Sequence, residues 1–142
     1  MANRDFSATP TVAPAWRRTG LVLSTLAILF FVMDAGGKLI APATMIANTP
    51  PLGLPADVGF YRLLGAILAI CTAIHAWPRT ALLGAVLLTG FLGGAIAVNL
   101  RAQMPLFGNT LFGVYVGALM WAGILLRRPQ VLAALGLASP KG

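Results

Sequence analysis

Two residues of opposite charge lie four positions apart inside an otherwise apolar stretch of the sequence. Asp34 and Lys38 interrupt the run from Gly20 to Ala41, and this spacing places both side chains on one face of a helix. A charge in hydrocarbon costs roughly 2.5–3.5 kcal/mol on insertion scales, and an acid beside a base shares that cost. Lys38 can reach toward the membrane surface, whereas the shorter Asp34 cannot. The pair is therefore either a self-neutralising structural element or a polar site inside a helix bundle.

Three more polar residues are expected at the membrane depth of this pair. Arg62 follows the start of the next apolar run, and Asn99 and Arg101 close the run after it. Snorkelling to lipid headgroups would explain Arg62 and Arg101 but explains Asp34 poorly. The whole cluster is net positive, which suits an anion, a lipid phosphate or a quinone carbonyl. The predicted ligand-binding residues are Asp34, Lys38, Arg62, Asn99 and Arg101, and no catalytic residue is assigned.

The chain has one histidine and one cysteine. A single histidine excludes bis-histidine haem ligation within one chain, and a single cysteine excludes an internal disulfide or a Cys-x-x-Cys redox pair. We therefore expect no metal and no covalently bound cofactor, which leaves a quinone to consider. His75 is interpreted as a residue of the membrane interface, with proton exchange with a quinone as the alternative. Cys71 is expected to be inert filler.

Four apolar runs must position these side chains. They extend from Gly20 to Ala41, from about Asp57 to Trp77, from a cap at Thr80 to Leu100, and from about Asn109 to Leu126. Each is long enough to approach the roughly 20 residues that a membrane-spanning helix needs. Residues 42–56 are rich in proline and predict a structured loop outside the membrane. The sequence thus predicts an all-α membrane protein, an antiparallel bundle of four transmembrane helices.

The composition supports this fold class. Only 9% of the residues are charged and 58% are hydrophobic, whereas an average soluble domain carries about 25% charge. A soluble enzyme, a disordered chain and a coiled coil are therefore excluded. The predicted organisation is a flexible cytoplasmic tail over residues 1–19, a four-helix transmembrane domain over residues 20–128 and a C-terminal cytoplasmic segment over residues 129–142.

The basic residues predict the orientation in the membrane. The net charge is +7, and the basic residues lie between the apolar runs without forming a dense patch. We therefore expect contact with the lipid bilayer and no nucleic-acid partner. The positive-inside rule places both termini of a multi-pass protein in the cytoplasm. The side of the termini carries Arg4, Arg17, Arg18, Arg79, Arg127, Arg128 and Lys141, and the other side carries Lys38, Arg62 and Arg101.

Small residues are spaced for close helix packing. Gly90 and Gly94 form one GxxxG motif, and Gly113 and Gly117 form another. Such motifs let helix backbones approach closely in lipid. Packing within the four-helix bundle is the favoured role, and a homodimer through these glycines is the competing one.

Three stretches of the sequence resemble the DoxX-like family of small membrane proteins. They are FFVMDAGGKLIAP (Phe30 to Pro42), PRTALLGAVLLTGFLGGAIAVNLR (Pro78 to Arg101) and VYVGALMWAGILLRRPQ (Val114 to Gln130). The resemblance implies a four-helix bundle in the bacterial inner membrane. It also implies redox work, because relatives include the membrane part of a thiosulfate:quinone oxidoreductase and a subunit joined to oxidative-stress enzymes. Asp34, Lys38 and Arg101 match family motif positions, whereas Asn99 stands where many relatives carry histidine.

Two hypotheses of function differ in what they predict for the bundle. The first is a redox-associated membrane subunit that binds quinone or another small lipophilic ligand, and it predicts a pocket that reaches Asp34. The second is a non-catalytic accessory or assembly subunit with a membrane or redox protein partner, and it predicts no pocket. A small-solute or anion carrier is disfavoured, because the chain lacks an inverted repeat and mid-membrane polar residues. Enzyme activity of the chain alone is neither predicted nor excluded.

Overall fold

The computed structural model describes residues 13–48 and 52–136, and these residues are all-α. Within them, four segments are long and apolar enough to cross a membrane. The predicted all-α membrane protein with four spanning helices is therefore confirmed. The elements are α1 (Pro14–Ile40), α2 (Pro42–Asn48), α3 (Val58–Ala76), α4 (Ala81–Arg101), the π-helical turn η1 (Leu106–Thr110), α5 (Phe112–Arg127) and α6 (Pro129–Ala134).

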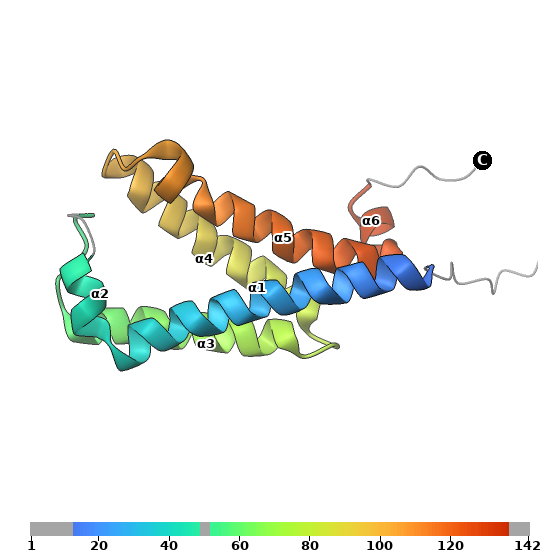
Figure 1. Ribbon diagram of the computed structural model, residues 1–142, viewed down its shortest axis with the longest axis horizontal. Helices are drawn as coiled ribbons and strands as arrows, with labels where there is room; N and C mark the ends of the chain where they lie inside the picture. Colours follow the sequence, from blue (N-terminus) through green and yellow to red (C-terminus); the bar gives the residue numbers. More distant parts are fainter. Residues whose placement is uncertain (1–12, 49–51, 137–142) are drawn as a thin grey trace, which may run out of the picture.

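The four long helices form a ring in which α1 and α4 each pack against both α3 and α5. Their directions alternate, so that the start of α1 and the short α6 lie at one end of the bundle (Figure 1). We call this the terminal end. The opposite loop end carries α2 and η1, and toward it α4 and α5 diverge from α1 and α3 (Figure 1). The bundle is thus closed at the terminal end and splayed at the loop end.

The first helix is longer than its apolar run. It begins at Pro14, because a proline in the first helical position has no N–H group to leave unpaired. Residues 14–19 therefore belong to α1, which corrects the prediction of a flexible tail for them. Residues 1–12 of that tail, and residues 137–142 of the C-terminal segment, lie outside the described residues.

The proline-rich segment after α1 contains a short helix, which corrects the loop predicted over residues 42–56. Pro42 occupies the first position of α2, where its fixed backbone angle favours a helix. At the corner between α1 and α2 the side chain of Met45 lies close against α1, so that its terminal methyl group occupies the space that a Cβ on Gly37 would take. This corner brings α2 over the loop end, where it packs against α3.

Local hydrogen bonds set where α3 begins and how it connects to α4. The carboxylate of Asp57 accepts a hydrogen bond of 2.8 Å from the backbone N–H of Phe60, and so caps the first turn of α3. The sequence predicted that Thr80 caps α4, but its side chain makes no capping hydrogen bond to that helix. Its hydroxyl instead donates to the carbonyl of Ile74 at 2.7 Å. Thr80 therefore tightens the α3–α4 connection.

Large apolar side chains cover the outside of the bundle. At most 33% of each membrane-spanning window is buried inside the bundle, and many outward-facing residues such as Leu29, Met33 and Val86 are more than half exposed. A water-soluble monomer rarely exposes so much contiguous apolar surface. The outer face is therefore suited to contact with lipid.

The two GxxxG motifs have different surroundings. A Cβ on Gly113 would lie 3.0 Å from Ile96 of α4, and one on Gly117 would lie 3.5 Å from Leu92. This motif therefore works in packing within the bundle, as favoured. A Cβ on Gly90 or Gly94 would meet no heavy atom of the described residues within 4 Å. The homodimer through these glycines stays a prediction.

Candidate functional site

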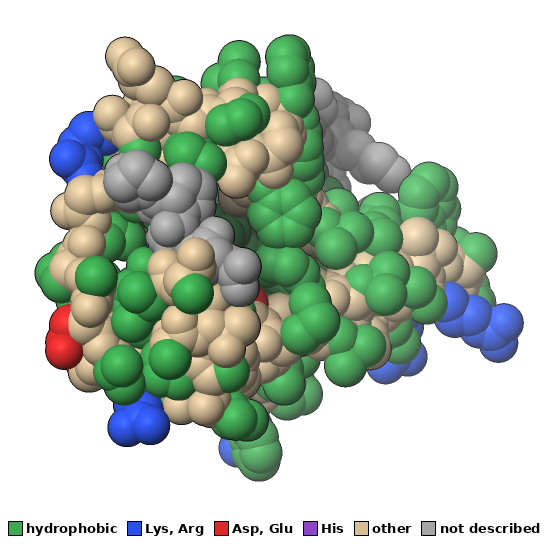
Figure 2. Space-filling view, turned by 60° about the vertical axis from the view of Figure 1, so that its left-hand side comes forward, with side chains coloured by type: hydrophobic (Ala, Val, Ile, Leu, Met, Phe, Trp, Pro, Cys, Tyr) green, Lys and Arg blue, Asp and Glu red, His purple; other side chains and the backbone are tan. Residues whose placement is uncertain are grey.

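A cavity of about 540 Å³ lies at the loop end, among the diverging helices. This volume falls in the range of about 300–1,000 Å³ that is usual for small-molecule sites. Figure 2 shows the corresponding hollow on the loop-end face, with hydrophobic side chains around it. Phe30 of α1, Leu64 of α3, Phe91 of α4 and Phe112 of α5 give it apolar walls. The rings of Phe30 and Phe112 pack edge to face, with centroids 5.2 Å apart.

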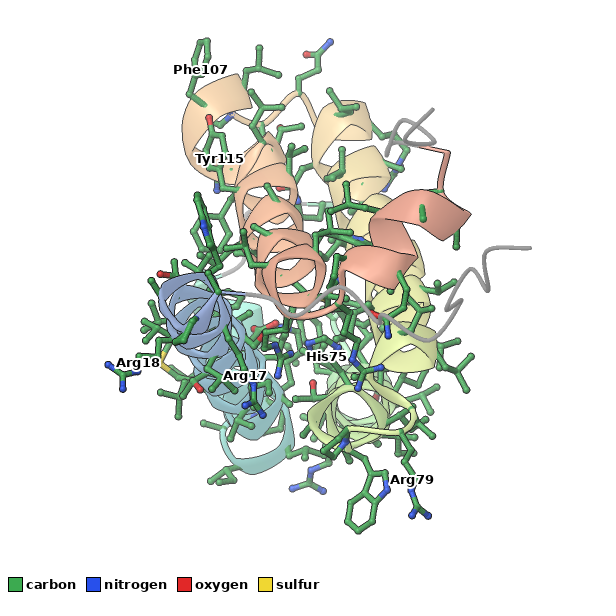
Figure 3. The ribbon with its side chains drawn as sticks, turned by 90° about the vertical axis from the view of Figure 1, so that its right-hand side faces the viewer. Arg17, Arg18, His75, Arg79, Phe107 and Tyr115 are labelled. Carbon is green, nitrogen blue, oxygen red and sulfur yellow. The ribbon has the colours of Figure 1, made fainter. Side chains whose placement is uncertain are left out.

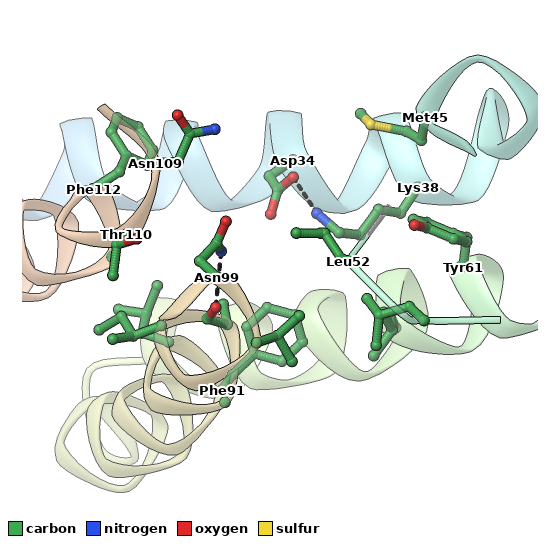
Figure 4. Close-up of a pocket in the computed structure, with 18 of the residues that line it drawn as sticks. Asp34, Lys38, Met45, Leu52, Tyr61, Phe91, Asn99, Asn109, Thr110 and Phe112 are labelled. Carbon is green, nitrogen blue, oxygen red and sulfur yellow. Dashed lines mark hydrogen bonds and ion pairs between the residues drawn. The ribbon is translucent and has the colours of Figure 1, made fainter. Parts of the chain in front are cut away.

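Asp34 and Lys38 bring the charge into this cavity. The Lys38 ammonium donates a hydrogen bond to Oδ1 of Asp34, one helical turn away on α1, and both side chains line the cavity (Figure 4). The Lys38 side chain is only 16% exposed. It therefore bends back toward Asp34 and does not reach for the membrane surface. The pair neutralises itself and also presents polar atoms to the cavity, which combines the two interpretations of the sequence.

Asn99 faces the pair from the opposite wall. Its Nδ2 donates a hydrogen bond of 2.8 Å to the carbonyl of Ala95, one turn earlier on α4. This bond turns Oδ1 of Asn99 toward Asp34 across the cavity (Figure 4). The cavity thus offers hydrogen-bond acceptors on Asp34 and Asn99 and a charged donor on Lys38.

Arg62 and Arg101, the remaining predicted ligand residues, are exposed and do not line this cavity. Arg62 lies next to Tyr61, which is buried, and a step of one residue turns a side chain by about 100° around a helix. Arg62 therefore points away from the interior. The structure brings together only Asp34, Lys38 and Asn99 of the five residues.

Arg101 acts on the cavity through the backbone. Its guanidinium donates to the carbonyl of Leu52, in the segment that leads into α3. Gly53 follows with a φ of 65°, and a Cβ there would collide with the guanidinium. Leu52 and Leu54 both line the cavity. Arg101 thus bonds to a segment that forms part of the cavity wall without lining the cavity itself.

Two polar residues of the cavity were missed by sequence reasoning. Asn109 and Thr110 belong to η1 and line the cavity beside Asn99 (Figure 4). The chain winds more widely here, because the N–H of Leu111 reaches back to the carbonyl of Leu106 at 2.8 Å. The available signal was the position of these two polar residues at the loop end of the fourth apolar run, at the depth already assigned to Asn99.

A buried histidine lies inside the terminal end. His75 is only 2% exposed, which corrects its interpretation as a residue of the membrane interface. Figure 3 shows it among the helices, whereas Arg18 and Arg79 point outward. Its Nδ1 lies 2.9 Å from the carbonyl oxygen of Ala81, to which it donates. Its Nε2 is buried without a hydrogen-bond partner in the described part of the chain.

The helices α3 and α4 pack closely beside His75. A Cβ on Gly84 of α4 would collide with the backbone of His75, so only glycine lets α3 and α4 approach so closely there. The cavity and His75 lie at opposite ends of the bundle, and His75 does not line the cavity. Cys71, one turn before His75, is buried in the apolar core.

The comparisons with known proteins give one match. A family model described as the DoxX-like family matches residues 22–123, which is more than half of the chain and runs from α1 into α5. None of the curated proteins and none of the solved structures compared with the chain matches it.

Proposed function

This chain belongs to the DoxX-like family, and from that premise we propose that it is a redox-associated membrane subunit that binds quinone or another small lipophilic ligand beside Asp34. The observation that carries the proposal is the cavity of about 540 Å³ that reaches Asp34 between the helices. An accessory subunit whose polar residues only fixed the helix register would need no such cavity.

The polar atoms of the cavity suit a ligand head that both accepts and donates hydrogen bonds. Lys38 can donate to a carbonyl oxygen, and the carboxylate of Asp34 can accept from a hydroxyl group. Oδ1 of Asn99 adds a second acceptor on the facing wall. This combination serves the carbonyl groups of a quinone and the hydroxyl groups of a quinol in the same place. The aromatic walls at Phe30, Phe91 and Phe112 suit the apolar part of such a ligand.

One observation favours the alternative function. Asp34 and Lys38 already satisfy each other within α1, as they would in a purely structural pair. In that case the chain is an accessory subunit, and a membrane or redox protein covers one apolar face of the bundle.

We also propose the bacterial inner membrane as the location, with the terminal end in the cytoplasm. The support is the distribution of charge, because Arg18 and Arg79 point outward at the terminal end (Figure 3), where Arg17 is exposed as well.

Purification in mild detergent, followed by mass spectrometry of co-eluting quinones, lipids and proteins, tests the function. We expect the parent protein and an Arg62→Gln control to retain a lipophilic ligand, because Arg62 lies outside the cavity. Asp34→Asn should lose about tenfold in loading. An Asn99→Ala variant removes a cavity acceptor without unpairing a charge, so it separates lost binding from lost folding. Equal loading of all four proteins would refute the site.

A further inference from the structure

The helix α4 carries three glycines where it passes the cavity. A Cβ on Gly90, Gly93 or Gly94 would meet no heavy atom of the described residues within 4 Å, and all three positions are exposed. Gly90 and Gly94 line the cavity, whereas Gly93 does not. At Gly90 and Gly94 the helix α4 therefore adds no side chain to the edge of the cavity, and the outward-facing Gly93 lies beside them.

Leu92 and Ile96 of α4 face Gly117 and Gly113 of α5, and two residues turn a helix by about 200°, so Gly90 and Gly94 lie on the face of α4 that is turned away from α5. Near the terminal end α3 and α4 are in close contact, through Gly84 and His75. Toward the loop end they diverge (Figure 1), and the cavity wall on the α3 side is formed by half-buried Phe60 and Leu64. Substituting any large residue for Gly90 or Gly94 would narrow this gap. The gap opens on the apolar outer surface of the bundle, which is suited to contact with lipid.

Asn99 and Gly90 are too far apart for a single ring to contact both. Asn99 and Gly90 are nine residues apart on α4, which corresponds to about 13 Å along the helix axis. A ligand with its head between Asn99 and Asp34 therefore needs an extended apolar part to reach Gly90. At the loop end the cavity is lined by Leu52 and Leu54, whose segment Arg101 holds.

We propose that the gap over Gly90 and Gly94 is a lateral opening to the bilayer, and that the ligand is a membrane-dissolved amphiphile with a hydrocarbon tail. Its polar head lies at Asp34 and Asn99, and its tail leaves the bundle between α3 and α4 across the two glycines. This inference rests on the proposed function, because it assigns the chemical class of the ligand and its route into the same cavity. Gly90 and Gly94 then determine specificity for the tail.

Two probes and three proteins test the opening. The probes are decylubiquinone, which has a saturated tail, and the tailless dimethoxy-methyl-benzoquinone with the same ring. The proteins are the parent, Gly90→Leu/Gly94→Leu and the matched control Gly93→Leu, each in lipid nanodiscs, with binding measured by equilibrium dialysis. We expect the double variant to bind decylubiquinone about tenfold more weakly and the tailless ring unchanged. Gly93→Leu should bind both probes as the parent does.

A milder double variant, Gly90→Ala/Gly94→Ala, controls for folding, because each added Cβ meets open space. This variant should unfold at the parent temperature or above. It should bind only the tailed probe more weakly than the parent does, and the loss of affinity should be smaller than in the leucine variant. The inference is overturned if the leucine double variant binds the tailed probe as the parent does, or if Gly93→Leu weakens binding of the tailed probe equally. It is also overturned if the leucine double variant loses binding of the tailless ring. If the parent binds neither probe, the quinone proposal fails and this inference fails with it. If only the Asp34 and Asn99 variants lose binding, the site stands and the lateral opening does not.

Discussion

Nη2 of Arg127, on α5, donates a hydrogen bond of 2.8 Å to Oγ of Ser24, on α1. This bond joins the first and the last long helix at the terminal end, opposite the Asp34–Lys38 pair. Nε of Arg127 also donates to the carbonyl of Gly123 at 3.0 Å, and Ser24 is only 3% exposed. A charged side chain at the end of a membrane helix thus serves as an interhelical tie. The terminal end is held together by polar contacts, while the loop end stays open around the cavity.

Removing this tie should destabilise the bundle without affecting the cavity. Ser24→Ala leaves the Nη2 donor of Arg127 without its hydroxyl partner, so we expect a loss of about 1–2 kcal/mol in the free energy of unfolding. Unfolding in mild detergent, followed by circular dichroism, measures the loss. The matched control is Thr19→Ala, because the exposed hydroxyl of Thr19 bonds to Ala15 within its own helix. If both variants unfold like the parent, the tie contributes nothing to stability.

Gly84 should be the glycine of α4 that tolerates a methyl group least. A Cβ at this position collides with the backbone of His75, which cannot rotate away as a side chain can. We expect Gly84→Ala to cost about 1–3 kcal/mol, as overpacking does in other cores. Gly93→Ala adds the same methyl group to open space and should raise stability by up to about 1 kcal/mol through helix propensity. Thermal unfolding of the two variants side by side makes the comparison, and equal midpoints would contradict the close contact.

Arg101 should affect the ligand although it lies outside the cavity. In Arg101→Gln the carbonyl of Leu52 loses its charged donor, so the Leu52–Leu54 part of the wall is held less firmly. We expect loading with co-purified ligand to fall about threefold, and amide hydrogen exchange to speed up at residues 52–54. Arg62→Gln removes an equivalent charge from the same end and should change neither quantity. Loss of ligand with unchanged exchange would mean that Arg101 acts by direct contact instead.

The orientation can be measured with single cysteines. The sequence has one cysteine, Cys71, so a Cys71→Ala background carries no thiol. We expect Arg79→Cys, at the terminal end, to be protected from a membrane-impermeant maleimide in intact cells and to react after lysis. Arg62→Cys, at the loop end, should react in intact cells through the periplasm. The reverse pattern would place the terminal end outside and would show that charge counting misassigned the topology.

The sequence alone determined the fold class and the position of the charged pair. Long apolar runs must form helices in lipid, because every backbone polar group has to be satisfied within the segment. The spacing of Asp34 and Lys38 places them on one face of any helix, whatever surrounds it. These features are local or depend on the solvent alone, so they could be predicted without knowing how the helices pack.

Only the tertiary structure decided which of the other polar residues meet. Asn99 faces the cavity and Arg62 does not, although both lie near the loop end of an apolar helix. The difference lies in how each helix is rotated within the bundle, because Tyr61 of α3 is buried and Arg62 is turned by about 100° from it. The same packing buries His75 against Ala81, six residues further along the chain but on the next helix. Helix rotation and crossing are properties of side-chain fit between segments, and the periodicity of one segment does not contain them.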